Sequence, residues 1–118
     1  MIEIINMEPT LMEKIRSISE YYSSEHQLKK AKEELQELLA ELEAAQIING
    51  RIILPGNTWS EDADAMIMCI QLAMQHGKEE KVLEQMHYKA DRQLRRIEDE
   101  KKETAWQQGI MSRFTEVE

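Results

Sequence analysis

The most informative segment of this 118-residue chain is SEHQLKKAKEELQELLAELEAAQ, residues 24–46, because helical periodicity runs through it without a Gly or a Pro. Its apolar residues recur at steps of three and four: Leu28, Ala31, Leu35, Leu38, Leu42 and Ala45. Ser24 and Gln27 have the spacing of a capping box and mark the start of the helix. We therefore predict an amphipathic helix from Ser24 to about Gln46.

A shorter helix is predicted before this segment, and a turn-rich loop after it. Residues 11–22 have an amphipathic pattern, and Thr10 and Glu13 in front of it have capping-box spacing. Residues 47–59 contain two dipeptides that favour turns, Asn49-Gly50 and Pro55-Gly56. Isoleucines flank the first of these dipeptides, so the loop has room for a small hairpin.

Two further helices are predicted towards the C-terminus. Thr58 or Ser60 caps the first, which ends at Gly77, a residue suited to a left-handed C-terminal turn. The second runs from near Lys78 to about Glu103, and residues 105–118 form a tail that either docks on the protein or contacts a partner. The fold class is therefore all-α, a four-helix bundle in a single domain over residues 1–118.

Composition and charge exclude several classes of function. The formal net charge of −8 disfavours binding to polymeric nucleic acid and to anionic membrane surfaces. The longest apolar run, residues 65–70, is far shorter than the roughly 20 residues of a transmembrane helix. The first ten residues lack the basic region of a secretory signal, and the single cysteine, Cys69, is expected to pack in an apolar helix face. A cytoplasmic location follows as an expectation.

Carboxylates lie where apolar residues are expected. Glu34 and Glu37 border the apolar stripe of the 24–46 helix, where a solvated flank is the ordinary explanation. In the following helix, Glu61 and Asp64 fall inside the stripe expected to be buried, and unpaired carboxylates are costly there. Three explanations remain open: a capping role for Glu61 with Thr58, salt bridges to Lys30 or Lys89, or a shared cation. Oxygen ligands alone favour Mg²⁺ or Mn²⁺ and disfavour zinc.

These residues resemble a known family. Glu34-Leu-Gln-Glu37 followed by Glu61-Asp-Ala-Asp64 is similar to the ExxE and ExxD pair of the MazG-like all-α nucleoside triphosphate pyrophosphohydrolases. The strings HQLKKAKEELQEL and EDADAMIMCIQLA resemble the two metal-binding helices of that superfamily, and VLEQMHYKADRQLRRI resembles the basic helix of its phage and prophage members. The resemblance spans about residues 25–97, the expected metal-binding core.

The resemblance implies a fold, a cofactor and a reaction. It implies a helical homodimer or homotetramer that binds Mg²⁺, with Mn²⁺ as an alternative, through four carboxylates: Glu34, Glu37, Glu61 and Asp64. The implied reaction converts a nucleoside triphosphate and water into the monophosphate and pyrophosphate. Lys89, Arg92 and Arg96 share one face of the last helix and are candidate phosphate ligands, with Lys30 as a further candidate. An exposed basic stripe explains the same three residues equally well.

Some roles stay open at this stage. Glu33, Glu41 and the metal-binding carboxylates themselves are alternatives for positioning the attacking water. His26 with Gln27 contacts the nucleotide if that end of the helix lines the pocket. Trp59 and Trp106 are expected to anchor a core or an interface rather than stack on a base.

Two readings compete with the hydrolase. One is a non-catalytic helical interaction or accessory protein of phage origin, whose acidic residues only keep a bundle in solution. The other is a family member that binds metal or nucleotide without catalysis. The first does not account for carboxylate pairs on two consecutive helices.

Overall fold

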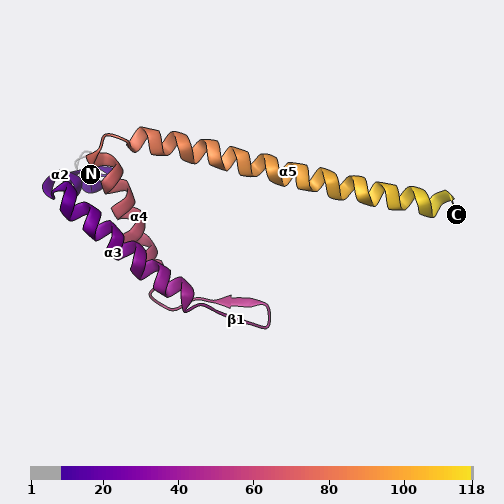
Figure 1. Ribbon diagram of the computed structural model, residues 1–118, viewed down its shortest axis with the longest axis horizontal. Coiled ribbons are helices and arrows are strands. Elements are labelled where there is room, and N and C mark those ends of the chain that lie inside the picture. The colour runs from indigo at the N-terminus through magenta and orange to yellow at the C-terminus, as the bar shows by residue number, and fades with distance from the viewer. Residues whose placement is uncertain (1–8, 118) are drawn as a thin grey trace, which may run out of the picture. The chain divides into compact units, whose positions relative to one another are not determined.

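The structure, a computed structural model, describes the backbone of residues 9–117 and the side chains of residues 9–109 (Figure 1). It is mostly helical, as expected, with one small antiparallel sheet. The chain divides into two compact units between Glu79 and Glu80. The single domain and the four-helix bundle stay predictions, because the described residues of the first unit form three helices.

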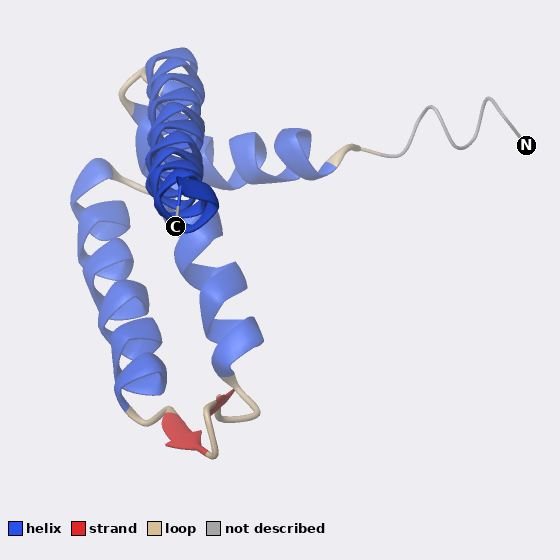
Figure 2. Ribbon diagram, turned by 90° about the vertical axis from the view of Figure 1, so that its right-hand side faces the viewer, coloured by secondary structure: helices blue, strands red, loops and turns tan. Residues whose placement is uncertain are grey.

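The first unit is built on a pair of helices joined by a hairpin. Helices α3 and α4 lie side by side, and the hairpin connects them at one end (Figure 2). Helix α2 packs on α4 and precedes α3 in the chain. The elements are α2 (Leu11–Tyr21), α3 (Ser24–Glu43), β1 (Gln46–Ile48), β2 (Arg51–Ile53) and α4 (Thr58–Gln75).

The predicted capping residue is observed at one of the three helix starts. Thr10 caps α2 as predicted, since its hydroxyl accepts a hydrogen bond from the Glu13 N–H at 3.2 Å. Helix α3 is capped by Ser23 instead of Ser24, through a bond from the His26 N–H at 3.1 Å. Helix α4 begins after Asn57 with no side-chain cap. The predictions of Ser24, Thr58 and Ser60 as caps are therefore wrong.

The predicted hairpin is present, and its turn explains the sequence. Asn49 has φ 53° and Gly50 has φ 75°, the two positive values of a type I′ turn. Strands β1 and β2 pair Ile47 with Ile52, and both side chains are strongly exposed. A two-stranded sheet without a packed face is only marginally stable in water. The turn and the hydrogen bonds between the two strands therefore stabilise this hairpin.

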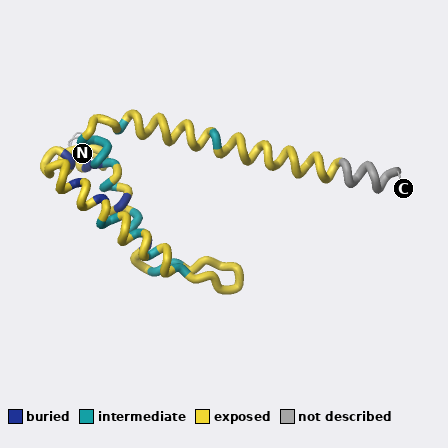
Figure 3. Tube along the Cα trace, viewed as in Figure 1, coloured by how far each residue is buried: buried dark blue, intermediate teal, exposed yellow. Residues whose placement is uncertain are grey.

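The core of the first unit is small (Figure 3). Part of it is polar. Among the side chains that the structure describes, the buried positions combine three apolar residues with four polar ones: Ile15, Ala31, Ala65, Ser19, Gln27, Thr58 and Gln71. The leucine stripe of α3 that was expected to be buried is about half exposed, and it comprises Leu28, Leu35, Leu39 and Leu42. A pair of helices covers only one side of each partner, which leaves this stripe open.

Helix α4 ends as the sequence predicts. Gly77 has φ 64°, and the N–H groups of Gly77 and Lys78 donate to the carbonyls of Met74 and Ala73. This is a Schellman motif, in which the left-handed residue is ordinarily glycine.

Gly77→Ala is expected to lower the free energy of unfolding by about 1 kcal/mol, because an L side chain is strained at this backbone geometry. A Cβ at this position meets no atom within 4 Å, so the backbone alone is responsible. Gly56→Ala is the matched control, since Gly56 is equally open and lacks a positive φ. Urea denaturation of both variants measures the difference. Equal stability of the two variants would contradict the assignment.

The second unit comprises helix α5, which continues from Glu79 to Val117. The predicted end at about Glu103 is wrong, and residues 105–117 belong to this helix instead of forming a separate tail. Neither a proline nor a turn signal interrupts the segment after Glu103, and a single glycine is tolerated within a helix. Trp106 is 67% exposed, whereas the side chains of Ile110, Met111 and Phe114 lie outside the described ones. Every helix in the described part of the chain is too short or too polar to cross a membrane.

Candidate functional site

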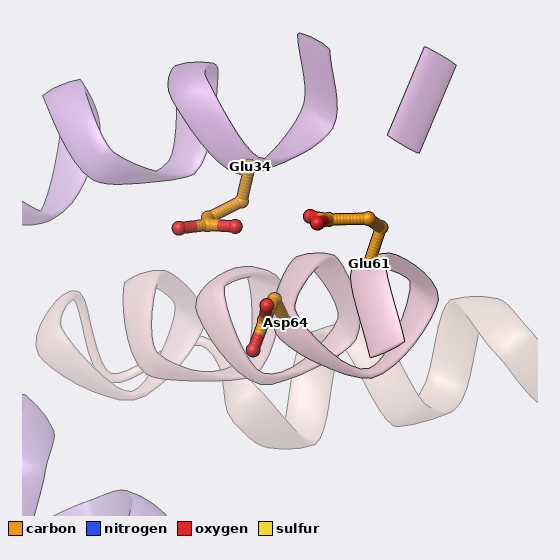
Figure 4. Close-up of side chains that lie close together, drawn as sticks. All are labelled: Glu34, Glu61 and Asp64. Atoms are coloured by element: carbon orange, nitrogen blue, oxygen red, sulfur yellow. The ribbon is translucent and has the colours of Figure 1, made fainter. Parts of the chain in front are cut away.

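Three of the four predicted carboxylates meet between α3 and α4. Glu34 comes from α3, and Glu61 and Asp64 come from the first two turns of α4 (Figure 4). One carboxylate oxygen from each lies within 4.8 Å of the other two. Residues three apart share a helix face, so the pairing of α3 with α4 suffices to bring Glu61 and Asp64 opposite Glu34.

Two oxygens of this cluster are buried without partners. Glu34 and Glu61 are half-buried, and in each residue Oε2 has no hydrogen-bond donor among the described residues. A buried anionic oxygen without a donor is costly, and a bound cation is one group that offsets this cost. The described residues therefore leave two polar atoms of this cluster without hydrogen-bond partners.

Glu37, the fourth predicted carboxylate, borders the cluster. It is exposed and lies one turn after Glu34 on α3. Its charge raises the pKa of both Glu34 and Glu61. All four predicted residues therefore gather at one place, with Glu37 outside the tightest group of three.

The electrostatics of the cluster favour protonation. Burial first, and then the charge of Glu37, raises the pKa of Glu34 above its ordinary value of 4.5. Burial and the hydrogen bond with Glu37 raise the pKa of Glu61 in the same way. Asp64 contributes to both shifts, while Lys30 lowers the pKa of Glu34. The carboxylates repel one another when ionised, and this repulsion favours a cation between them.

The pKa shifts predict the pH dependence of the metal-free protein. Above pH 4.5 the folded protein binds these protons more tightly than the unfolded chain, so ionisation costs stability as the pH rises. We expect the Glu34→Gln/Glu61→Gln double variant to exceed the wild type in stability most near neutral pH. The excess should shrink towards about pH 5, measured by urea denaturation in EDTA. An excess that grows on acidification would contradict the assignment.

The lowered pKa of Glu79 acts in the opposite direction. Its backbone hydrogen bond and the ion pair with Arg16 at 3.2 Å favour the carboxylate, so this stability is lost as the pH falls through the lowered pKa. The wild type and the double variant both contain Glu79. Its contribution to the pH dependence therefore cancels when the free energies of unfolding of the two proteins are subtracted.

Two expectations about these residues are wrong. Asp64 is exposed, not buried, because the α3–α4 pair leaves that side of α4 open to water. The capping box of Thr58 with Glu61 does not form, since Thr58 lies inside the helix and the Glu61 N–H donates to the Asn57 carbonyl. Among the described ion pairs none includes Glu61 or Asp64. Lys30 instead pairs with Glu33 at 3.4 Å.

A pocket of about 170 Å³ adjoins the carboxylates, and Glu34 lines both. Its wall contains an amide pair in which Gln71 Nε2 donates to Gln27 Oε1 at 2.8 Å. The stacked rings of Tyr22 and His26, with centroids 4.5 Å apart, also line it. The sequence pointed to His26 and Gln27 at this end of the helix. It missed Gln71, whose signal is a polar residue on the apolar face of α4.

The predicted phosphate ligands lie on two elements. Lys30 lines the pocket from α3, one turn before Glu34. Lys89, Arg92 and Arg96 lie on α5, where the Arg92 guanidinium is 5.9 Å from the centroid of the Tyr88 ring. Their role in phosphate binding stays a prediction. Of the two candidates for positioning water, Glu33 is held by Lys30 and Glu41 is half-buried.

Two residues expected to be covered are exposed. Cys69 is a free, exposed cysteine, so its predicted packing role is wrong. Trp59 is 67% exposed and does not anchor the core of the first unit. Neither residue belongs to the buried positions of α4, which are Thr58, Ala65 and Gln71.

Fold and site together define a mostly helical protein with a cluster of carboxylates suited to a hard divalent cation. No protein-family model, curated protein or solved structure matches the chain.

Proposed function

We propose that this protein is a Mg²⁺-dependent nucleoside triphosphate pyrophosphohydrolase that converts a ribo- or deoxyribonucleoside triphosphate and water into the monophosphate and pyrophosphate. The observation that carries the proposal is the approach of carboxylate oxygens from Glu34, Glu61 and Asp64 to within 4.8 Å. The unpartnered Oε2 atoms of Glu34 and Glu61 support it, because they are ligand atoms without a donor. Control or cleaning of the nucleotide pool is the corresponding cellular role.

The residues present suit the proposed metal. The cluster offers only carboxylate oxygens, and hard cations such as Mg²⁺ and Mn²⁺ select oxygen ligands. Glu34, Glu61 and Asp64 would hold the cation, and Glu37 adjoins them as a fourth ligand. When bound, the cation would neutralise phosphate charge and lower the pKa of a coordinated water.

The remaining chemistry falls to the basic side chains. Charge on the phosphate oxygens grows as the leaving group departs, and positively charged groups near the outer phosphates stabilise it. Lys30 is one candidate, since its charge lowers the pKa of Glu34. Lys89, Arg92 and Arg96 are the candidates from α5 for the outer phosphates.

Release of pyrophosphate from a panel of ordinary and modified nucleoside triphosphates tests the proposal. We expect activity with Mg²⁺ or Mn²⁺ and none in EDTA. A thermal melt run in parallel should rise with added Mg²⁺, because a ligand that binds only the folded state stabilises it. Absence of both hydrolysis and metal stabilisation would refute the proposal. Stabilisation without hydrolysis would indicate a protein that binds metal without catalysis.

Self-association is expected in solution. The leucine stripe of α3 and the hairpin isoleucines are exposed, and so are Leu83, Met86 and Leu94 on α5. A single copy leaves this apolar surface in water, and a symmetric partner of the same chain would cover it. Light scattering should therefore return a dimer or tetramer of the 13.9 kDa chain. A single 13.9 kDa species at micromolar concentration would contradict this expectation.

The same exposed apolar surface favours a second candidate function, a non-catalytic helical interaction protein. In that case a different protein covers the leucine stripe, and the carboxylates only keep the chain in solution. The second candidate predicts that the protein melts at the same temperature with and without Mg²⁺. The metal titration therefore separates the two candidates directly.

A further inference from the structure

Helix α4 has a second apolar face, on the side away from α3. Five residues recur along it at steps of four, three, four and three, the spacing of a coiled-coil seam: Trp59, Ala63, Met66, Ile70 and Ala73. At about 100° per residue, Glu61 and Asp64 lie roughly 140 to 160° around the helix from the centre of this α4 seam. The seam is therefore separate from the carboxylate cluster.

The α4 seam is open to water. Helix α4 packs against α3 and α2, yet Trp59 is 67% exposed and Met66 is 58% exposed. Ala63 is exposed as well, while Ile70 and Ala73 are half-buried. A helix that is apolar on two opposite faces is ordinarily buried inside a bundle, so this face requires a further helix to cover it.

The charges of α4 indicate which helix fits. All three charged residues of this 18-residue helix are acidic and lie in its first two turns: Glu61, Asp62 and Asp64. The rest of the helix is uncharged. A second copy packed in parallel would bring the acidic ends of both helices together, and these ends repel each other. An antiparallel copy instead places each acidic end beside an uncharged end and sets the two helix dipoles in opposite directions.

We propose that the α4 seam is a homodimer interface, in which two copies of the chain pack their α4 helices antiparallel about a two-fold axis. In such a pair each seam residue fills a gap between residues of the other helix. An axis between Asp64 and Ala65 achieves this, because it sets Trp59 level with the partner's Ile70 and Ala63 level with the partner's Met66. The small side chain of Ala63 lets the helices approach closely, and the larger residues fill the space around it.

The interface does not depend on the proposed hydrolase. The seam and the carboxylate cluster lie on different sides of α4, so the dimer can form whether or not the protein binds a metal or hydrolyses a nucleotide.

Cysteine cross-linking tests the direction of the pair. Cys69 is the single cysteine of the chain, and Cys69→Ser gives a background without thiols. In this background Met66→Cys lies next to the two-fold axis and should form a disulfide-linked dimer on mild oxidation, seen on a non-reducing gel. Ala73→Cys is the matched control at the far end of the seam. Its two copies would lie about 25 Å apart along the axis, too far for a disulfide, so the chains should stay separate.

A charge placed in the seam tests the interface without cross-linking. Met66→Glu should raise the dissociation constant of the dimer about a hundredfold or more in light scattering, because two carboxylates would be buried without partners. Met86→Glu is the matched control, since Met86 is similarly exposed, at 62%, and lies on α5. It should leave the dissociation constant unchanged. Circular dichroism checks that both variants keep their helices.

The outcomes identify what covers the seam. The inference is overturned if the wild type is a monomer, or if folded Met66→Glu dimerises as the wild type does. Dissociation by Met86→Glu alone would assign the interface to α5 instead. Disulfide formation by both Met66→Cys and Ala73→Cys would indicate a parallel pair and would refute the antiparallel one. If Met66→Glu fails to fold, the two cysteine variants decide.

Discussion

Replacing Asp64 by Asn is expected to abolish Mg²⁺-dependent hydrolysis and to raise the melting temperature of the metal-free protein. Loss of a direct ligand should cost about a hundredfold or more in activity, since even groups that only orient a metal ligand cost 10- to 100-fold. The stability gain has a separate cause. The Asp64 charge raises the pKa of both Glu34 and Glu61, and Asn removes this repulsion while keeping the shape of the side chain.

Melting curves in EDTA and in Mg²⁺ measure both effects on one protein. Asp62→Asn is the matched control, because Asp62 lies on the same helix two residues away and outside the cluster. It should keep the stabilisation by Mg²⁺ and the activity. If Asp64→Asn instead melts lower without metal and responds to Mg²⁺ as the wild type does, Asp64 supports the fold and is not a ligand.

Hydrolysis in oxygen-18 water is expected to place the label entirely in the nucleoside monophosphate. Water positioned by the carboxylate cluster would attack the α-phosphorus, and pyrophosphate would leave as one unit. Mass spectrometry of early time points should show unlabelled pyrophosphate and no free orthophosphate. Label in orthophosphate, with the diphosphate as the nucleotide product, would refute the assigned reaction.

If the basic side chains on α5 bind the outer phosphates, Lys89→Ala and Arg92→Ala should slow turnover without changing the stabilisation by Mg²⁺, because these substitutions remove charge at the phosphates and leave the carboxylates intact. Arg95→Ala is the control on the same helix, since Arg95 lies outside the helix face that Lys89, Arg92 and Arg96 share. If neither Lys89 nor Arg92 affects turnover, Lys30 becomes the main candidate for the phosphates.

Secondary structure was largely predictable because its signals are local. The helical spacing of leucines on α3, the Asn49-Gly50 turn and the Gly77 terminator each act through neighbouring residues, and all three are present. The errors fall at helix ends. Ser23 and Ser24 are equally good caps, and the sequence does not distinguish them. Helix α5 continues past its predicted end at about Glu103, because no proline or turn signal follows that residue.

The candidate site was partly predictable. Spacing of three places Glu61 and Asp64 on one face of α4, and the same holds for Glu34 and Glu37 on α3. Which faces meet depends on the packing of α3 against α4, and the sequence pattern does not specify it. The exposure of Asp64 and the amide bond between Gln27 and Gln71 both arise from that packing.

By itself, the sequence determined the helices, the hairpin turn and the residue types that can bind a cation, because backbone hydrogen bonding and side-chain periodicity are set by neighbours along the chain. Only the tertiary structure decided that oxygens of Glu34, Glu61 and Asp64 approach within 4.8 Å and that Gln27 and Gln71 pair beside them. These contacts join residues far apart in the chain. Their geometry depends on how α3 and α4 pack together, and no local sequence pattern specifies that packing.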